Sequence, residues 1–301
     1  GVEPLQTALA AKANVIIAGR CSDAAIYAAL PIMLGYNPAQ AWHLGKIVEC
    51  GAQVIEPREG QDCIIGTLRD GYFEVEPGHP EKHCTKTRVA AHTLYENPLP
   101  HELKEPSGVL DSTHCSFQQI DPRTVRVSGS SFLPTETYTV KLEGVSKVGH
   151  RSMFVAGIRD PILINQFDAF SEACRERTRE QIASLGISDS AYTLKFRTYG
   201  HGAVMGDREF AKIDNCPIEL CVIGEVIADT EAISRAVLAK ARYSLLHTDF
   251  EGRLCISGNL AFPFSPSDIS VGEVYDFNVW HTLKLDDPLE PFQITYRNIS
   301  G

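Results

Sequence analysis

Two short polar segments of this sequence carry side chains suited to acid–base chemistry. The first is residues 19–23, Gly-Arg-Cys-Ser-Asp, and the second is residues 49–53, Glu-Cys-Gly-Ala-Gln. A carboxylate held in a partly apolar cleft can titrate near neutrality, which suits it to proton transfer. We predict that the two segments face one pocket, in which Asp23, Glu49 and Cys50 are the catalytic residues.

Each of these residues also has a structural interpretation. Arg20 offers a planar fork of donors for a carboxylate or phosphate, or it pairs with Asp23. Ser22 or Asp23 would cap a following helix through its side-chain oxygen. Cys50 is a nucleophile only if its pKa is lowered, and is otherwise a small buried apolar residue. The predicted substrate-binding residues are Gly19, Arg20, Ser22 and Gln53.

Histidines lie outside these two segments. His201 has a glycine on each side, so the backbone can approach a ligand closely, and we predict it as a fourth catalytic residue. His79, His83 and Cys84 have a spacing that a metal could use. A closed structural zinc site needs four ligands, however, and no fourth residue stands at a recognisable spacing. We therefore predict no metal site, and the sequence requires no cofactor.

The elements around residues 19–23 predict a parallel sheet. Val15–Ile17 is a short continuous apolar run, typical of a strand covered on both faces, and Leu5–Lys12 and Ala24–Leu34 are predicted helices. In open α/β sheets ligands bind beyond the carboxyl ends of the strands, where residues 19–23 would lie. No strand precedes this one to pair with it. We therefore expect a segment of a longer polypeptide, or one chain of an assembly such as a homo-oligomer.

We predict residues 1–134 to be the remainder of this α/β domain, with a hairpin and loop insertion. Asp70-Gly71 stands between the apolar runs Ile64–Leu68 and Tyr72–Val75, which indicates a hairpin. Residues 97–108 contain three prolines and are predicted to be a loop.

Residues 135–301 have a different pattern, which predicts an α+β domain. A sheet backed by helices on one face would bury the apolar side of each element. The predicted helices are residues 160–179 and 230–246, and the predicted strands are 138–142, 152–158, 192–198, 218–227 and 275–285. The fold class is therefore α/β with a partial open parallel sheet at the N-terminus, followed by an α+β domain.

Charge and cysteine content exclude several classes of partner. The 28 basic and 38 acidic residues give a net charge of −10, which disfavours nucleic acid and anionic membranes. The nine cysteines form no small-domain disulfide framework, so we expect reduced thiols and a cytoplasmic protein. No apolar run approaches the roughly 18 residues of a membrane helix, and no signal peptide is visible.

Several segments together resemble the acyclic terpene utilisation protein family. They are residues 1–4, 15–23, 45–53, 123–129, 199–206, 258–263 and 286–292, so the resemblance covers essentially the whole chain. Members of this family are usually longer at the N-terminus by an α/β segment with a glycine-rich stretch, which we expect this chain to lack. Where members have a glycine-rich turn, this chain has residues 78–84.

The resemblance implies a metabolic enzyme that acts on a carboxylate or an acyl thioester. We predict a lyase, hydratase or isomerase for a small organic acid or its coenzyme A ester. Arg20 would bind the carboxylate, Glu49 or Asp23 would move the proton alpha to the carbonyl, and amides near Gly19 or Gly51 would stabilise the enolate. The alternative is a non-catalytic subunit that binds an acyl ligand or a partner chain.

Overall fold

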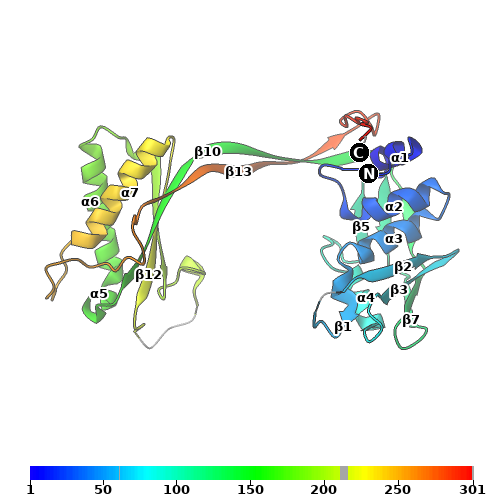
Figure 1. The fold of residues 1–301 in the computed structure, drawn as a ribbon, viewed down its shortest axis with the longest axis horizontal. Helices are drawn as coiled ribbons and strands as arrows, with labels where there is room; N and C mark the ends of the chain where they lie inside the picture. Colours follow the sequence, from blue (N-terminus) through cyan, green and yellow to red (C-terminus); the bar gives the residue numbers. More distant parts are fainter. Residues whose placement is uncertain (61, 211–215, 300–301) are drawn as a thin grey trace. The chain divides into compact units, whose positions relative to one another are not determined.

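The computed structural model describes residues 1–60, 62–210 and 216–299. These residues form two compact units, coloured along the chain in Figure 1. The first unit comprises Gly1–Leu142 together with His281–Gly301, and the second comprises Glu143–Trp280. The sequence predicts a division after residue 134. The two units divide a little later than that, and the C-terminal residues belong to the first unit.

Two α-helices of the first unit begin at a residue whose side chain caps the helix. Asn37 accepts a hydrogen bond from the Ala39 amide, and Thr85 accepts one from the Arg88 amide, so each caps its helix. The alanine-rich side of the second helix packs against the third, where Trp42 is buried. The helices are α1 (Glu3–Ala10), α2 (Asp23–Met33), α3 (Pro38–Val48) and α4 (Lys86–Thr93), and a 3₁₀ turn, η1 (Gly51–Val54), follows α3.

The strands of the first unit form three small sheets. Their orders are β2-β3-β8-β7, β5-β6-β9 and β1-β4, and the strand pairs are antiparallel. The bounds are β1 (Ile55–Glu56), β2 (Ile64–Leu68), β3 (Tyr72–Pro77), β4 (His83–Cys84), β5 (Glu102–Glu105), β6 (Gly108–Asp111), β7 (Ser116–Gln119), β8 (Val125–Ser128) and β9 (Ser131–Pro134).

Two predictions about these strands have opposite outcomes. The hairpin at Asp70-Gly71 is confirmed, since β2 and β3 pair across it and Gly71 adopts a positive φ of 84°. The loop predicted over residues 97–108 is wrong in part, because β5 lies within it and pairs with β6. The local sequence of β5, Glu-Leu-Lys-Glu, does not indicate a strand, because the strand forms only through its tertiary contact with β6.

The strand predicted at Val15–Ile17 is not present. These residues follow an irregular path between α1 and α2, and the side chains of Val15 and Ile17 are exposed. A strand needs a neighbour to take its backbone hydrogen bonds, and none of the described residues supplies one. The structure thus mixes helices with small antiparallel sheets, as an α+β fold does, and the predicted parallel sheet is not seen.

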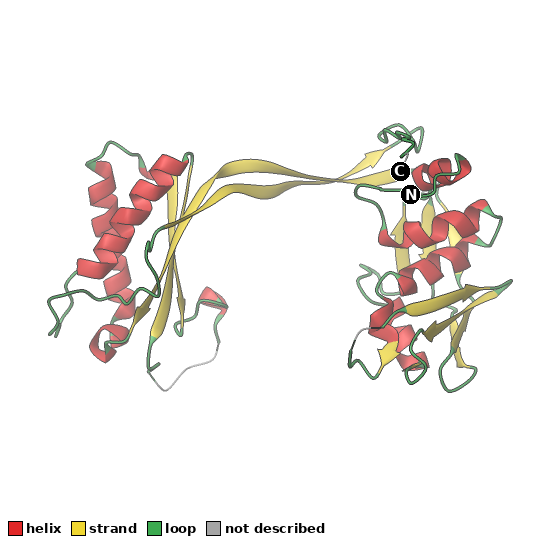
Figure 2. Ribbon diagram, viewed as in Figure 1, coloured by secondary structure: helices red, strands yellow, loops and turns green. Residues whose placement is uncertain are grey.

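The second unit has the β-α-β-β-α-β order of a ferredoxin-like fold. Its sheet has the order β11-β12-β10-β13, and Figures 1 and 2 show α6 and α7 side by side on one face. Phe154, Val222 and Leu238 form part of the buried core between these layers. The elements are β10 (Thr139–Ile158), α5 (Pro161–Asn165), α6 (Phe167–Ala183), β11 (Tyr192–Tyr199), β12 (Leu220–Ala228), α7 (Glu231–His247) and β13 (Ile269–Lys284), although the first residues of β10 and the last residues of β13 belong to the first unit.

The α+β arrangement predicted for this part of the sequence is therefore found. One difference is that residues 138–142 and 152–158, predicted as two strands, fall in the single long strand β10, except for Tyr138, which precedes it. Among the described residues, no helix combines the length and the apolar character that crossing a membrane requires.

Candidate functional site

A close contact between two helices creates the candidate site. Gly45 on α3 faces the Ala24 carbonyl on α2 so closely that a β-carbon at Gly45 would lie 2.6 Å from that oxygen. The first turn of α2 is thereby held against the last turns of α3. This contact brings Ser22 and Asp23 to the same part of the first unit as Lys46 and Glu49.

Ser22 orients a carboxyl group that the sequence analysis did not single out. Its hydroxyl donates to Oε1 of Glu105 at 2.9 Å. Ser22 does occupy the N-cap position of α2, but its side chain makes no capping bond, so the predicted cap is wrong. The hydroxyl is engaged by Glu105, which β5 places beside the start of the helix.

Glu105 is chemically unusual because it is largely withdrawn from water. Burial raises the pKa of its carboxyl to about 7, although the hydrogen bond from Ser22 acts in the opposite direction. The group can therefore both hold and release a proton near neutral pH. Only its position in the sheet reveals this, since the surrounding proline-rich sequence carries no catalytic motif.

A buried ion pair lies in the same electrostatic neighbourhood. Nζ of Lys46 is 2.8 Å from Oε1 of Glu49, and the two side chains are only 6% and 11% exposed. The charges of both residues act on the carboxyl of Glu105. A buried ammonium paired in this way offers a fixed positive charge for a substrate oxygen.

Two aromatic side chains of the α4 region lie against Lys46. His92 is 5% exposed, and the rings of His92 and Tyr95 stack with centroids 5.8 Å apart. Lys46 Nζ lies 5.7 Å from the centroid of the Tyr95 ring. Burial lowers the pKa of His92, and the positive charge of Lys46 lowers it further, although a hydrogen bond between the ring and the Lys46 backbone acts in the opposite direction. This environment favours the neutral imidazole. We call Lys46, Glu49, His92 and Tyr95 the Lys46 cluster.

Cys50 is exposed at the end of α3, next to this cluster. Partial burial raises the pKa of its thiol, and the negative charges of Glu49 and Asp23 raise it further. This environment favours the thiol over the thiolate, which is the opposite of what a predicted nucleophile needs.

The remaining predicted site residues lie in more exposed places. Gly19 and Arg20 are on the exposed segment before α2, and Gln53 in η1 accepts a hydrogen bond from Arg58 at 2.9 Å. His201 belongs to the second unit, where its Nε2 lies 2.8 Å from Asp168 Oδ1. Of the predicted residues, the structure thus gathers Ser22, Asp23, Glu49 and Cys50.

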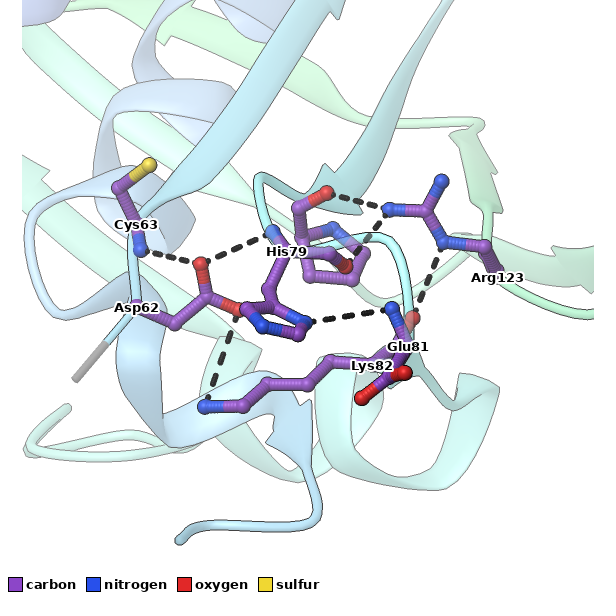
Figure 3. A network of polar contacts seen from close by, with 7 residues as sticks. Asp62, Cys63, His79, Glu81, Lys82 and Arg123 are labelled. Carbon is purple, nitrogen blue, oxygen red and sulfur yellow. Dashed lines mark hydrogen bonds and ion pairs between the residues drawn. The ribbon is translucent and has the colours of Figure 1, made fainter. Parts of the chain in front are cut away.

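The loop from residue 77 to 84, which carries the possible metal ligands, is organised by an arginine and an aspartate (Figure 3). The guanidinium of Arg123 donates to the carbonyls of Pro77, His79 and Lys82 at 2.8–3.0 Å. Asp62 Oδ1 accepts from the amides of Cys63 and His79. These hydrogen bonds account for the shape of the loop.

The three residues with metal-like spacing have separate environments. Cys84 is fully buried, which raises the pKa of its thiol to about 12, and His83 faces Glu56 at 3.7 Å. His79 accepts a hydrogen bond from the Glu81 amide through Nδ1. Within residues 1–60, 62–210 and 216–299, no three His, Cys, Asp or Glu side chains are grouped as metal ligands would be.

A protein-family model matches most of the chain. The family described as "Acyclic terpene utilisation family protein AtuA" matches residues 1–243. The chain belongs to this family. The resemblance predicted from the sequence is therefore confirmed, and it associates the protein with terpene utilisation. The match includes every residue of the candidate site, from Ser22 to Glu105. No curated protein and no solved structure matches the chain.

Proposed function

We propose that the protein is an enzyme of terpene utilisation that acts on a small organic acid or its coenzyme A ester by acid–base chemistry. The observation that carries this proposal is Glu105, a carboxyl group whose pKa of about 7 lets it exchange a proton at neutral pH. A reaction of the lyase, hydratase or isomerase type needs such a group next to the carbon alpha to a carbonyl.

The neighbouring residues supply complementary roles. The ammonium of Lys46 would bind the carboxylate or thioester oxygen and stabilise the negative charge that develops when the alpha proton leaves. Glu49 would hold Lys46 in place through their 2.8 Å ion pair. Because Glu49 is engaged in this way, we assign proton transfer to Glu105 in preference to the Glu49 and Asp23 of the sequence prediction.

The test measures proton transfer directly. The chain is incubated in deuterated water with isovalerate and with isovaleryl-coenzyme A, and deuterium at the alpha carbon is followed by NMR. We expect Glu105→Gln to slow exchange by about 10²-fold or more, as loss of a general base does. Glu102→Gln, on the same strand β5, is the matched control and should exchange at the unaltered rate. Equal rates in the two variants would exclude Glu105 as the base.

A second candidate function, that of a partner-dependent subunit, is supported by an apolar surface. The side chains of Val15, Ile17, Ile26, Leu30 and Leu34 are exposed on and next to α2, whose opposite side is buried. We propose an α/β segment as the occupant, with strands that flank residues 15–17, because a continuous apolar run suits a strand covered on both faces. Added in trans, the N-terminal segment of a longer family member should protect the amides of residues 14–18 from hydrogen exchange. Unchanged exchange would argue against this role.

A further inference from the structure

One buried polar atom of the Lys46 cluster has no partner within the described residues. Nε2 of His92 is enclosed and makes no hydrogen bond there, in a side chain that is 5% exposed. A buried polar group without a partner costs roughly 1–3 kcal/mol, so such atoms are rare in folded proteins and call for an explanation. The ring as a whole is not isolated, since it makes a hydrogen bond with the Lys46 backbone and feels the charge of the Lys46 side chain, but Nε2 is left without a partner. A ligand bound at this position would supply the missing partner.

The chemistry of the ring narrows the kind of ligand group. A neutral imidazole presents Nε2 either as an N–H donor or as a lone-pair acceptor, depending on the tautomer. A hydroxyl group can satisfy both tautomers, since it donates and accepts. A carboxylate can only accept, and it has a better partner in the ammonium of Lys46. The two side chains together therefore fit a molecule that carries a hydroxyl and an acidic or acyl oxygen.

Tyr95 controls access to this position. Its ring stacks on His92 and also faces Nζ of Lys46, so it covers both groups. The residue is 51% exposed, and its hydroxyl makes a hydrogen bond with the side chain of Glu96. Rotation of this one side chain would expose the face of the His92 ring on which it stacks.

We propose that His92 recognises a hydroxyl group of the substrate while Lys46 binds its carboxylate or thioester oxygen, and that Tyr95 closes over the ligand. The substrate class is then a hydroxy acid or a hydroxyacyl thioester. This inference rests on the proposed function, because it concerns the same site, and it adds a residue that determines specificity.

The binding experiment uses the full chain with Glu105→Gln, so that no turnover interferes. Titration calorimetry compares 2-hydroxyisovalerate and 3-hydroxyisovalerate with isovalerate, each as the free acid and as the coenzyme A ester. We expect at least one hydroxylated compound to bind about 10-fold more tightly than its deoxy counterpart, as a recovered buried hydrogen bond implies. Adding His92→Phe should abolish that preference while the affinity for isovalerate changes little. Two results in the Glu105→Gln chain would overturn the inference. One is equal affinity for the hydroxylated compounds and their deoxy counterparts, and the other is no binding of any compound.

A second measurement does not depend on how a His92 variant folds. With ¹⁵N-histidine in the Glu105→Gln chain, the ring-nitrogen signal of His92 should shift when the hydroxylated compound binds and stay in place with the deoxy compound. His43, whose two ring nitrogens already contact Ser130 and Thr93, is the internal control. A His92 signal that shifts equally with both compounds would refute hydroxyl recognition. A failure of the proposed function would be seen in the deuterium-exchange experiment instead, as an alpha-carbon exchange rate that is the same with and without Glu105.

Discussion

His43 makes the stability of the first unit depend on pH. The side chain is fully buried on α3, where Nδ1 lies 2.7 Å from the Ser130 hydroxyl and Nε2 lies 2.9 Å from that of Thr93. Thr93 donates its own proton to the Val89 carbonyl, so it must accept from Nε2–H. These contacts place a proton on Nε2, and burial keeps Nδ1 unprotonated, so that it accepts from the Ser130 hydroxyl. Protonation of Nδ1 would put a positive charge in a site closed to water.

The pKa of His43 sets how strongly the free energy of unfolding depends on pH. Burial lowers the pKa of His43 from 6.5 to about 3, so between these values the unfolded chain binds a proton that the folded chain does not. The contribution is fully present above pH 6.5 and is lost as the pH falls toward 3, by about 1.4 kcal/mol per pH unit. Acidification from pH 7 to 5 should therefore cost about 2 kcal/mol of unfolding free energy.

Glu105 acts with the opposite sign over the same interval. Its folded-state pKa is raised from 4.5 to about 7, so its contribution to stability is present below pH 4.5 and is lost as the pH rises through 7. Between pH 7 and 5 this group regains at most about 2 kcal/mol, and less after discounting for its partial exposure. The two groups nearly cancel, and the effect of His43 becomes visible only when Glu105 is replaced by Gln.

The assay follows urea unfolding at several pH values through the fluorescence of Trp42, which is buried next to His43. Trp280, the other tryptophan, is exposed and is replaced by Phe. In the Trp280→Phe, Glu105→Gln background, the unfolding free energy should fall by about 1.4 kcal/mol per pH unit below 6. Adding His43→Gln should remove most of that slope, whatever it does to stability at pH 7. An identical slope in both proteins would refute the assignment.

Two further predictions concern packing and thiol reactivity. Gly45→Ala should destabilise the protein by about 1–3 kcal/mol in urea unfolding, because the added β-carbon meets the Ala24 carbonyl at 2.6 Å. Gly19→Ala, which meets nothing within 4 Å, is the control, and equal stability of the two variants would contradict the close contact. Iodoacetamide should modify Cys255 well before Cys84, as read by peptide mass spectrometry. Cys255 is exposed, and the hydrogen bond from Ser257 lowers its pKa, whereas Cys84 is buried with a pKa of about 12. Modification of Cys84 at the same rate would show that its site opens readily.

Elements with a strong local pattern could be predicted from the sequence. The strand β12 and the helix α7 lie within two residues of their predicted bounds, because alternation and helical periodicity decide their structure. Val15–Ile17 has an equally clear strand pattern, yet it forms no strand. An apolar run indicates what a segment would do beside suitable neighbours, and the described residues provide none.

The candidate site could be predicted only in part. Two dense polar segments contain Ser22, Asp23, Glu49 and Cys50, and the residue types and spacing in these segments predict a site there. Glu105 and His92 have no such context. Their altered pKa values arise from burial by residues far away in the sequence, and no local pattern encodes that burial.

The order of the two units along the chain has a consequence for biosynthesis. The first unit is interrupted at Leu142 and resumes at His281, where the Leu285 amide donates to the Tyr138 carbonyl. A ribosome adds about 5–20 residues per second, so roughly 7–28 s pass between the two parts of this unit. During that time the second unit, which is continuous in the chain, can fold, while the first still lacks its last residues. The first unit is therefore complete only after the segment that begins at His281 has been made. We expect chaperones to bind the incomplete unit mainly during this interval.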